Sequence, residues 1–450
     1  MQFPLAIQSS RDPDNIAANP ERLVNAYSLP VPRGHEIKSV LGETLLTSVS
    51  SVFLRAMDSF NGTLYAATGG KAYMFSASNV ATQIGTITDD QNTDISSNFD
   101  ATCWTAGGQY FVYDGSFTEP TAGNFSSFGS VTFLAGRTIL TEKDGSQFCW
   151  SDISTPDTLP ALNFASAESR DDNLIRGKAF NGNLWLFGAE STEVWYPTGA
   201  GGADAFAAVS GGVIETGLKA FNLVTRFPGG LFLIGNDGIA YITAGAAFQP
   251  VSTVPVATAI SQGEPTNCFY YEDEGSKFCV IRFRDRPAWV YDITTGKWAE
   301  RATGDLDAWR SVVSTLHNGS WLVGTDSGNI STLGRTNSDG DKVLTRTIVS
   351  DNLYNDGERF RIAEFELFGR IGWNTVTDTE TRAPKLMLRT SRDGGLSWGQ
   401  ERVLSLGYLG DFSARVLARS LGQYRRFTSE IRMNDPVDVT LTASARVRPQ

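Results

Sequence analysis

The sequence predicts an all-β protein. Its composition is rich in glycine, with 45 of 450 residues, and 11% of the chain is aromatic while only 19% is charged. A pattern of short apolar runs separated by Gly, Asn and Asp turns also recurs through the first three quarters of the chain. No segment keeps a 3.6-residue apolar period over about 12 residues, so we expect few helices.

Each copy of the recurring pattern holds two short apolar runs, both closed by turn residues. Asn-Gly and Asp-Gly pairs supply the positive φ angles that tight hairpins need. The weaker copies begin at Gly107, Val131 and Lys277. The clearest copies are SFNGTLYAATGGKAYMF (Ser59–Phe75), AFNGNLWLFGAESTEVWY (Ala179–Tyr196), FPGGLFLIGNDGIAYI (Phe227–Ile242) and LHNGSWLVGTDSGNISTL (Leu316–Leu333).

The spacing of these copies predicts a β-propeller. Successive copies lie about 40 to 50 residues apart, the period of a four-stranded blade. One blade cannot bury both faces of its sheet, whereas blades packed in a ring can. The stretch from Thr47 to Gly340 has room for about six blades. The alternative is a β-sandwich with many hairpins.

Three segments are expected. Residues 1–46 form an N-terminal extended segment, residues 47–340 the propeller, and residues 341–450 a C-terminal β-sandwich-like domain. A polar turn cluster at Asn337–Asp341 marks the second boundary. Beyond it, runs such as RIAEFELFGRI, KLMLRTS and VDVTLTASARV alternate as half-buried strands do.

The C-terminal domain carries one Asp box, the pattern S-x-D-x-G-x-x-W formed by Ser391, Asp393, Gly395 and Trp398. In a hairpin turn, the Asp393 carboxylate can accept hydrogen bonds from turn N–H groups, and the Trp398 ring can cover the strands. Folding alone explains each residue type, so we assign the box a structural role.

No catalytic, cofactor-binding or metal-binding residues are predicted, and we expect that the protein is not an enzyme. The chain has two histidines and four cysteines without C-x-x-C spacing, a pattern unlike a zinc site. We interpret Cys103, Cys149, Cys268 and Cys279 as buried free thiols of a protein folded in a reducing cytoplasm.

The enzymatic alternative is a sialidase-like glycoside hydrolase. Such enzymes need several Asp boxes, an arginine cluster and a Tyr/Glu nucleophile pair. The segment YYEDEGS (Tyr270–Ser276) brings Tyr and Glu together, and Phe360–Ala363 is faintly similar to a sialidase F-R-I-P opening. A solvated turn explains the first segment, and the second follows the propeller instead of opening it.

The net charge of −11 disfavours wrapping a nucleic acid, because binding needs Lys and Arg to neutralise phosphates. An acidic wall lets a duplex pass without holding it. No run of about 18 apolar residues is present, so we expect no membrane-spanning segment. The N-terminus lacks the basic and apolar regions of a signal peptide.

Both ends of the chain resemble the tail-nozzle proteins of short-tailed bacteriophages, also called packaged-DNA stabilisation or tail accessory proteins. The N-terminal ERLVNAYSLPVP (Glu21–Pro32) is similar to the R-L-V-N-x-Y opening of that family. The C-terminal series runs from S-x-D-G-G-x-x-W through Leu406-Gly407, Arg415 and Leu421-Gly422 to DPVDVTL. The resemblance covers about 120 residues, namely Glu21–Pro32 and the stretch from Val343 to Val447.

The resemblance implies a structural virion protein with no cofactor. In that family, six copies form a tapered tube below the portal and its adaptor ring. The tube extends the DNA channel, retains packaged DNA and conducts it on ejection, without sequence-specific binding to the dsDNA in its lumen. It also meets a tail needle or plug and the tailspikes or fibres. The expected location is the virion tail, after assembly in the bacterial host cytoplasm.

One further alternative remains open from the sequence, a host-surface glycan- or receptor-binding propeller. Exposed aromatic clusters on one propeller face would favour it. Trp185, Trp195, Trp289 and Trp321 lie inside strand-like runs, and we interpret them as blade core.

Overall fold

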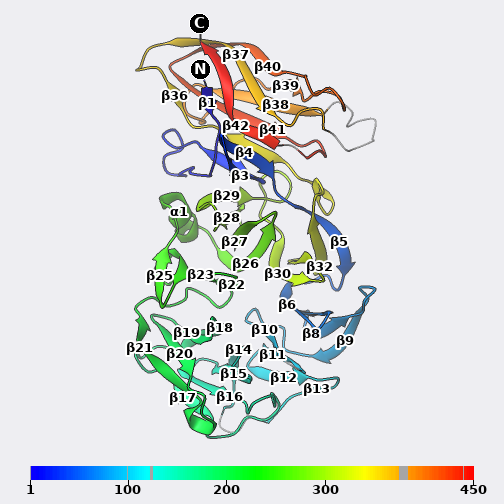
Figure 1. Cartoon of the computed structure of the whole chain (residues 1–450), viewed down its shortest axis with the longest axis vertical. Helices are drawn as coiled ribbons and strands as arrows, with labels where there is room; N and C mark the ends of the chain where they lie inside the picture. Colours follow the sequence, from blue (N-terminus) through cyan, green and yellow to red (C-terminus); the bar gives the residue numbers. More distant parts are fainter. Residues whose placement is uncertain (1, 99, 122–124, 374–383, 439, 450) are drawn as a thin grey trace.

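A computed structural model of the chain shows a β-propeller joined to a β-sandwich along the long axis of the molecule (Figure 1). It describes residues 2–98, 100–121, 125–373, 384–438 and 440–449. Both chain termini lie at the sandwich end (Figure 1).

Among the described residues, the propeller has seven blades, each an antiparallel sheet of four strands. The first three blades are β6 (Leu54–Phe60), β7 (Thr63–Thr68), β8 (Lys71–Phe75) and β9 (Ala81–Thr86); β10 (Asp94–Ser97), β11 (Thr102–Ala106), β12 (Gln109–Tyr113) and β13 (Phe117–Thr118); and β14 (Phe128–Leu134), β15 (Arg137–Glu142), β16 (Gln147–Trp150) and β17 (Phe164–Ser166).

The next three blades follow the same order along the chain. They are β18 (Leu174–Phe180), β19 (Asn183–Gly188), β20 (Thr192–Pro197) and β21 (Phe206–Ile214); β22 (Val224–Phe227), β23 (Gly230–Ile234), β24 (Ala240–Ala244) and β25 (Ala247–Pro250); and β26 (Pro265–Asp273), β27 (Ser276–Phe283), β28 (Ala288–Asp292) and β29 (Lys297–Arg301).

The seventh blade closes the ring with a strand from the N-terminal part of the chain. It consists of β30 (Ser311–His317), β31 (Ser320–Thr325), β32 (Asn329–Gly334) and β5 (Gly42–Ser48), and the short strands β33 (Ser338–Asp339) and β34 (Lys342–Val343) extend it. The pairing of β5 with β32 ties the start of the propeller to its end.

The sequence predicted about six blades, and the described residues form seven. The predicted blade count is therefore corrected. The seven quoted copies of the repeat fall one in each blade, so the pattern itself was right. At a period of about 40 to 50 residues, the stretch from Thr47 to Gly340 has room for six or seven blades, so its length alone does not decide the number. The blade that begins at Asp94 is the most compact, with a last strand of two residues, and such short blades make room for a seventh.

The hairpin turns explain why the repeat is visible in the sequence. Asn61 and Gly62 both have positive φ, 48° and 73°, between β6 and β7. Asn181-Gly182 and Asn318-Gly319 take the same conformation at the equivalent turns of two other blades. This is the two-residue turn whose twist matches antiparallel strands.

The propeller core consists of clusters between neighbouring blades. Leu54 and Phe75 of the first blade pack against Leu322 and Ile330 of the seventh, and similar clusters lie between the other blades. Trp185 and Trp289 are buried, and Trp195 and Trp321 pack against core clusters. These four tryptophans thus belong to the blade core, as the sequence indicated.

Helices are few, as expected. Within the described ranges they are α1 (Val254–Gln262), between the fifth and sixth blades, and the 3₁₀ turn η1 (Gly202–Asp204). Val256 and Ile260 bury one side of α1 in the cluster shared by the fourth to sixth blades.

The sandwich consists of two sheets built from both ends of the chain. Its first sheet has the order β3 (Ala26–Val31), β4 (Gly34–Ser39), β42 (Thr440–Pro449), β37 (Phe360–Gly369) and β40 (Val416–Tyr424), with β1 (Gln2–Pro4) paired to β42. Its second sheet has the order β2 (Arg22–Val24), β35 (Arg346–Val349), β41 (Arg426–Met433), β38 (Lys385–Ser391) and β39 (Arg402–Ser405), with β36 (Leu353–Tyr354) paired to β41.

The second sheet continues directly into the propeller. Strand β2 pairs with β35 on one side and, in parallel at Val24 and Glu300, with β29 of the sixth blade on the other. One ten-stranded sheet therefore runs from the propeller into the sandwich. The expected division of the chain at residues 46 and 340 stays a prediction, and strands of the first 46 residues join both parts.

A buried polar cluster holds the two parts together. The guanidinium of Arg301, on β29, is 1% exposed. It donates hydrogen bonds to Asp339 Oδ1 at 2.6 Å, Asn25 Oδ1 at 2.9 Å and the Leu41 carbonyl at 3.0 Å. It also lies over the Trp309 ring, 4.8 Å from the centroid. Three distant chain segments thus converge on one side chain.

Replacement of Arg301 by methionine should destabilise the protein strongly. The Asp339 carboxylate would remain buried without its cation, a change that costs about 3–5 kcal/mol. Urea denaturation of Arg301→Met measures the loss. Arg310→Met is the control, because Arg310 pairs with Asp341 at the surface, where a pair contributes about 1 kcal/mol or less. Equal losses of unfolding free energy in the two variants would contradict a large stabilising contribution from the buried cluster.

Candidate binding pocket at the propeller–sandwich junction

Ser391 ends β38, and the other three Asp-box residues lie in the connection between β38 and β39. The Asp393 carboxylate accepts the Ser397 N–H at 2.9 Å, the Ser391 hydroxyl at 2.7 Å, and the Ser397 hydroxyl. The Ser391 hydroxyl oxygen in turn accepts the Gly395 N–H at 2.8 Å. The polar groups of this turn are therefore satisfied within the turn.

The electrostatics of the turn favour the ionised carboxylate. Partial burial would raise the pKa of Asp393, but hydrogen bonds from Ser397 and Ser391 outweigh it and lower the pKa to about 2. The group is thus a poor proton donor near neutral pH.

The turn also contacts the N-terminal loop between β1 and β2. Gly394, with φ of 77°, lies so close that a Cβ there would be 2.5 Å from the Ala17 carbonyl oxygen. Arg426 and Asn352 donate hydrogen bonds to the same oxygen, at 3.1 and 3.0 Å. The loop is therefore fixed on the sandwich at the Asp-box turn.

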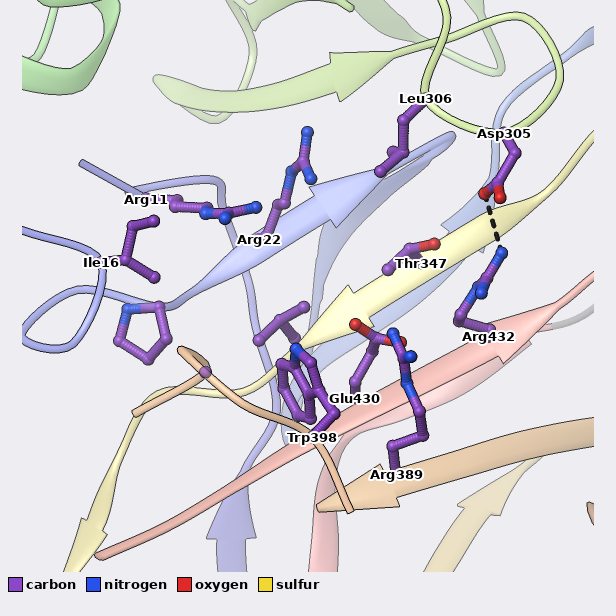
Figure 2. A pocket seen from close by; sticks show the side chains of 13 residues that line it. Arg11, Ile16, Arg22, Asp305, Leu306, Thr347, Arg389, Trp398, Glu430 and Arg432 are labelled. Atoms are coloured by element: carbon purple, nitrogen blue, oxygen red, sulfur yellow. Dashed lines mark hydrogen bonds and ion pairs between the residues drawn. The ribbon is translucent and has the colours of Figure 1, made fainter. Parts of the chain in front are cut away.

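A pocket of about 320 Å³ opens where this loop, the sandwich and the propeller meet (Figure 2). Trp398 of the Asp box and Leu306, from the connection between β29 and β30, form part of its wall. Ile16 and Pro20 of the N-terminal loop add apolar surface. The charged side chains in the wall are Arg11, Arg22, Asp305, Arg389, Glu430 and Arg432, and Thr347 adds a hydroxyl.

Three of the four arginines have carboxylate partners. Arg22 makes a bidentate contact with Glu300, at 2.8 and 2.6 Å. Arg389 Nε donates to Glu430 at 2.8 Å, and its guanidinium lies 5.5 Å from the centroid of the Trp398 ring. The third pair is Arg432 with Asp305 at 2.8 Å, drawn as a dashed line in Figure 2.

Arg11 differs from the other three. Among the described residues, no hydrogen bond or ion pair to its guanidinium is found, and Figure 2 shows the group extended toward Arg22. Burial and the neighbouring charge of Arg22 lower the pKa of Arg11, although Glu300 and Glu430 oppose the shift. Among the described residues, Arg11 is thus the lining arginine that has no ion-pair partner.

The central cavity of the propeller is a second candidate site. The first strand of every blade contributes to its wall, and its volume is about 380 Å³. Asp94 binds Arg176 at 2.6 Å and Lys178 at 3.1 Å within it. Burial and Arg176 lower the pKa of Lys178 to about 8, against the opposing effect of Asp94. The wall carries four cationic side chains, Arg55, Arg176, Lys178 and Arg226, and two carboxylates, Asp58 and Asp94.

The residues weighed for a sialidase-like site do not form one. Tyr270 donates a hydrogen bond to Glu272, but burial and this carboxylate raise the pKa of Tyr270, which opposes its use as a nucleophile. Arg361 lies on β37 of the sandwich and is exposed. In the part of the chain that the structure describes, no group of three or more His, Cys, Asp or Glu side chains could hold a metal ion.

Two other expectations can be compared with the structure. All four cysteines are buried and free, as the sequence indicated. No described helix is long and apolar enough to cross a membrane.

Sequence reasoning found the Asp-box side of the junction pocket but missed its arginines. They come from positions as distant as Arg11 and Arg432, and no local motif connects them. The ion-pair partners across the junction, such as Glu300 for Arg22, follow only from the pairing of β2 with β29.

Comparisons with known proteins agree with this architecture. The family model described as "Bacteriophage P22 Gp10, beta-propeller" matches residues 23–338, and the one described as "Bacteriophage P22 Gp10, beta-sandwich" matches residues 345–448. The fold and these matches define a structural protein of a bacteriophage tail. The chain belongs to the Gp10 family of bacteriophage P22, a family of virion tail components in short-tailed phages.

Solved structures with related shapes were also found. The computationally designed protein Ika8 has a TM-score of 0.43 and 12% identity, over 74% of this chain and 99% of that one. The WD40 β-propeller domain of Doa1 has a TM-score of 0.44 and 12% identity, over 65% of this chain and 97% of that one. No curated protein sequence matches the chain significantly.

Substitution of Gly394 by alanine should detach the N-terminal loop from the Asp-box turn. The new Cβ would meet the Ala17 carbonyl and would also sit at a positive φ, so we expect a loss of about 2–4 kcal/mol. The measurement is chemical denaturation. Gly357→Ala is the matched control, because Gly357 has φ of 81° and open space around it. Backbone strain alone predicts a loss of about 1–2 kcal/mol there. A loss no larger in Gly394→Ala than in the control would refute the close-contact explanation.

The Asp393 carboxylate should stabilise the protein only when ionised. Its pKa is about 2 in the folded chain and about 3.9 when unfolded, so its contribution is complete above pH 4 and is lost as the pH falls toward 2. We therefore expect the difference in Tm between the wild type and Asp393→Asn to shrink over that range. Thermal unfolding from pH 6 to pH 2 measures it, and a constant difference would rule out this role of the charge.

Proposed function

We propose that the chain forms the nozzle of a phage tail, as a closed ring that is a hexamer. The ring extends the DNA channel, retains the packaged genome and conducts it on ejection. The observation that carries the proposal is the match of both family models, in the order propeller then sandwich, over almost the whole chain. Closure into a tube requires two different contact faces on each copy.

The small central cavity of the propeller supports a DNA channel that is enclosed by several copies of the chain. Its own central cavity holds about 380 Å³, which is the volume of about a dozen water molecules. A DNA duplex, whose major groove alone is about 12 Å wide, does not fit there. The duplex would therefore pass through a lumen that several copies enclose.

The charge distribution favours the passage of DNA through the lumen without tight binding. Residues 1–340 contain 21 Lys and Arg against 35 Asp and Glu, a net charge of −14, whereas residues 341–450 contain 17 against 14, a net charge of +3. We infer that acidic propeller surfaces line the lumen and repel phosphates. A strongly basic lumen in an electrostatic map of the assembled ring would contradict this assignment.

The proposed partners are other virion proteins, assembled in the host cytoplasm. They are the portal and its adaptor on one side, and a tail needle or plug with tailspikes or fibres on the other. We propose no catalytic role, because the arginines of the junction pocket mostly have carboxylate partners and Tyr270 is not poised to ionise. The Asp box serves as a structural turn that receives the N-terminal loop.

Electron microscopy of the purified protein, alone and with its portal and adaptor, tests the nozzle proposal. We expect rings or short tubes of six copies with a lumen wide enough for a duplex, because a ring closes when two different faces of each copy meet. Mass photometry on the same samples gives the subunit number. A chain that stays monomeric in the presence of its adaptor would overturn the proposal.

A further inference from the structure

The junction pocket has the features of an anion site that its own chain leaves unfilled. Four guanidinium groups, those of Arg11, Arg22, Arg389 and Arg432, line the pocket together with the carboxylates of Glu430 and Asp305, and Glu300 pairs with Arg22 from outside the lining. The three carboxylates are engaged by the other three arginines. Arg11 therefore supplies the one charge that a ligand would balance.

Placing Arg11 there is unfavourable for the chain alone. Its guanidinium is partly removed from water and faces another cation, Arg22, across the pocket (Figure 2). A cation in such surroundings is destabilised until an anion joins it, because charges in a partly buried site are weakly screened. The side chains are thus arranged as in an anion-binding site without its ligand.

The volume and the lining residues of the pocket restrict which ligands can bind. A volume of about 320 Å³ admits a small group or one side chain, not a polymer. The Trp398 ring, Leu306 and Ile16 offer apolar contacts beside the guanidinium. A single unbalanced charge fits a monoanion, and the planar fork of an arginine matches a carboxylate with two parallel hydrogen bonds.

We propose that this pocket binds a carboxylate presented by a neighbouring virion protein, with Arg11 as the receiving group and Trp398 and Leu306 contacting the carbon chain behind it. The carboxylate comes from an Asp or Glu side chain or from a chain terminus. That the carrier is a virion protein rests on the proposed function; the preference for a carboxylate rests on the pocket alone.

The pocket also connects the ligand to the junction. Its wall combines the N-terminal loop, the β29–β30 connection and the sandwich strands β35, β38 and β41. A ligand that fills the pocket would therefore contact segments of both the propeller and the sandwich. Partner binding would hold the propeller and the sandwich in their present relation.

Binding of small probes to the full-length chain tests the proposal by ligand-observed NMR. The probes are N-acetylglutamate α-amide for a side chain, N-acetylphenylalanine for a terminus, benzoate for a free acid, and inorganic phosphate. We expect one or both peptide-like probes to bind in the millimolar range. Their uncharged counterparts, N-acetylglutamine amide and N-acetylphenylalanine amide, should bind at least tenfold more weakly.

Variants assign the binding to Arg11. Arg11→Gln should weaken the binding of the carboxylate probes at least tenfold, and Arg11→Lys should weaken their binding less. Arg33→Gln should change nothing, because Arg33 is exposed in the turn between β3 and β4, outside the pocket. Without ligand, the Tm of Arg11→Gln should equal or exceed that of the wild type, since a repulsive charge is removed.

Several results would overturn the proposal. They are phosphate binding as tightly as the carboxylates, unchanged binding in Arg11→Gln, or a marked loss of stability in that variant, which would make Arg11 a structural residue. Tighter binding of benzoate than of both peptide-like probes would exclude a protein carboxylate as the ligand. The probes bind single chains, so none of these results bears on ring formation, which electron microscopy tests separately.

Discussion

The structure depends on a cluster of buried charges at the junction between propeller and sandwich. Arg301 and Asp339 are both almost inaccessible to water, and Glu43 lies beside them, accepting hydrogen bonds from Trp309 and Ser311 at 2.7 Å each. Burial and the nearby charge of Asp339 raise the pKa of Glu43 to about 7. Removal of one partner from such a cluster leaves an uncompensated buried charge, so the surrounding segments are stable together in this arrangement.

The continuous sheet also fixes the propeller relative to the sandwich. A hinge between domains needs a linker with few contacts, but here β2 is hydrogen-bonded to a blade on one edge and to the sandwich on the other. The junction pocket exists because of this arrangement, since its wall is drawn from both parts and from the N-terminal loop. A carboxylate bound there would add a contact to an interface that is already rigid.

The sequence predicted local structure well and long-range structure poorly. The Asn-Gly turns fix φ at two residues each, so the hairpins and the all-β architecture could be read directly. The Asp-box residues interact within one turn, and their spacing alone predicts those contacts. The blade count depended on length and was wrong by one, because blade lengths vary too much for division to resolve six from seven.

The junction could not be predicted for a physical reason. Arg11 and Arg432 are more than four hundred positions apart, and neither carries a neighbouring residue that signals a pocket. Their proximity follows from the pairing of short N-terminal strands with C-terminal ones, such as the three-residue β1 with β42. Strands of that length leave no reliable period in the sequence.

The pairing of β1 with β42 also has a consequence for biosynthesis. Strand β1 is synthesised more than four hundred residues before its partner β42. Phe3 packs on Phe427, 5.5 Å between ring centroids, so this aromatic side chain has no such partner in the nascent chain until Phe427 has emerged. Closing so long a loop is slow, and the sandwich is therefore expected to be the last part to become protected from proteolysis.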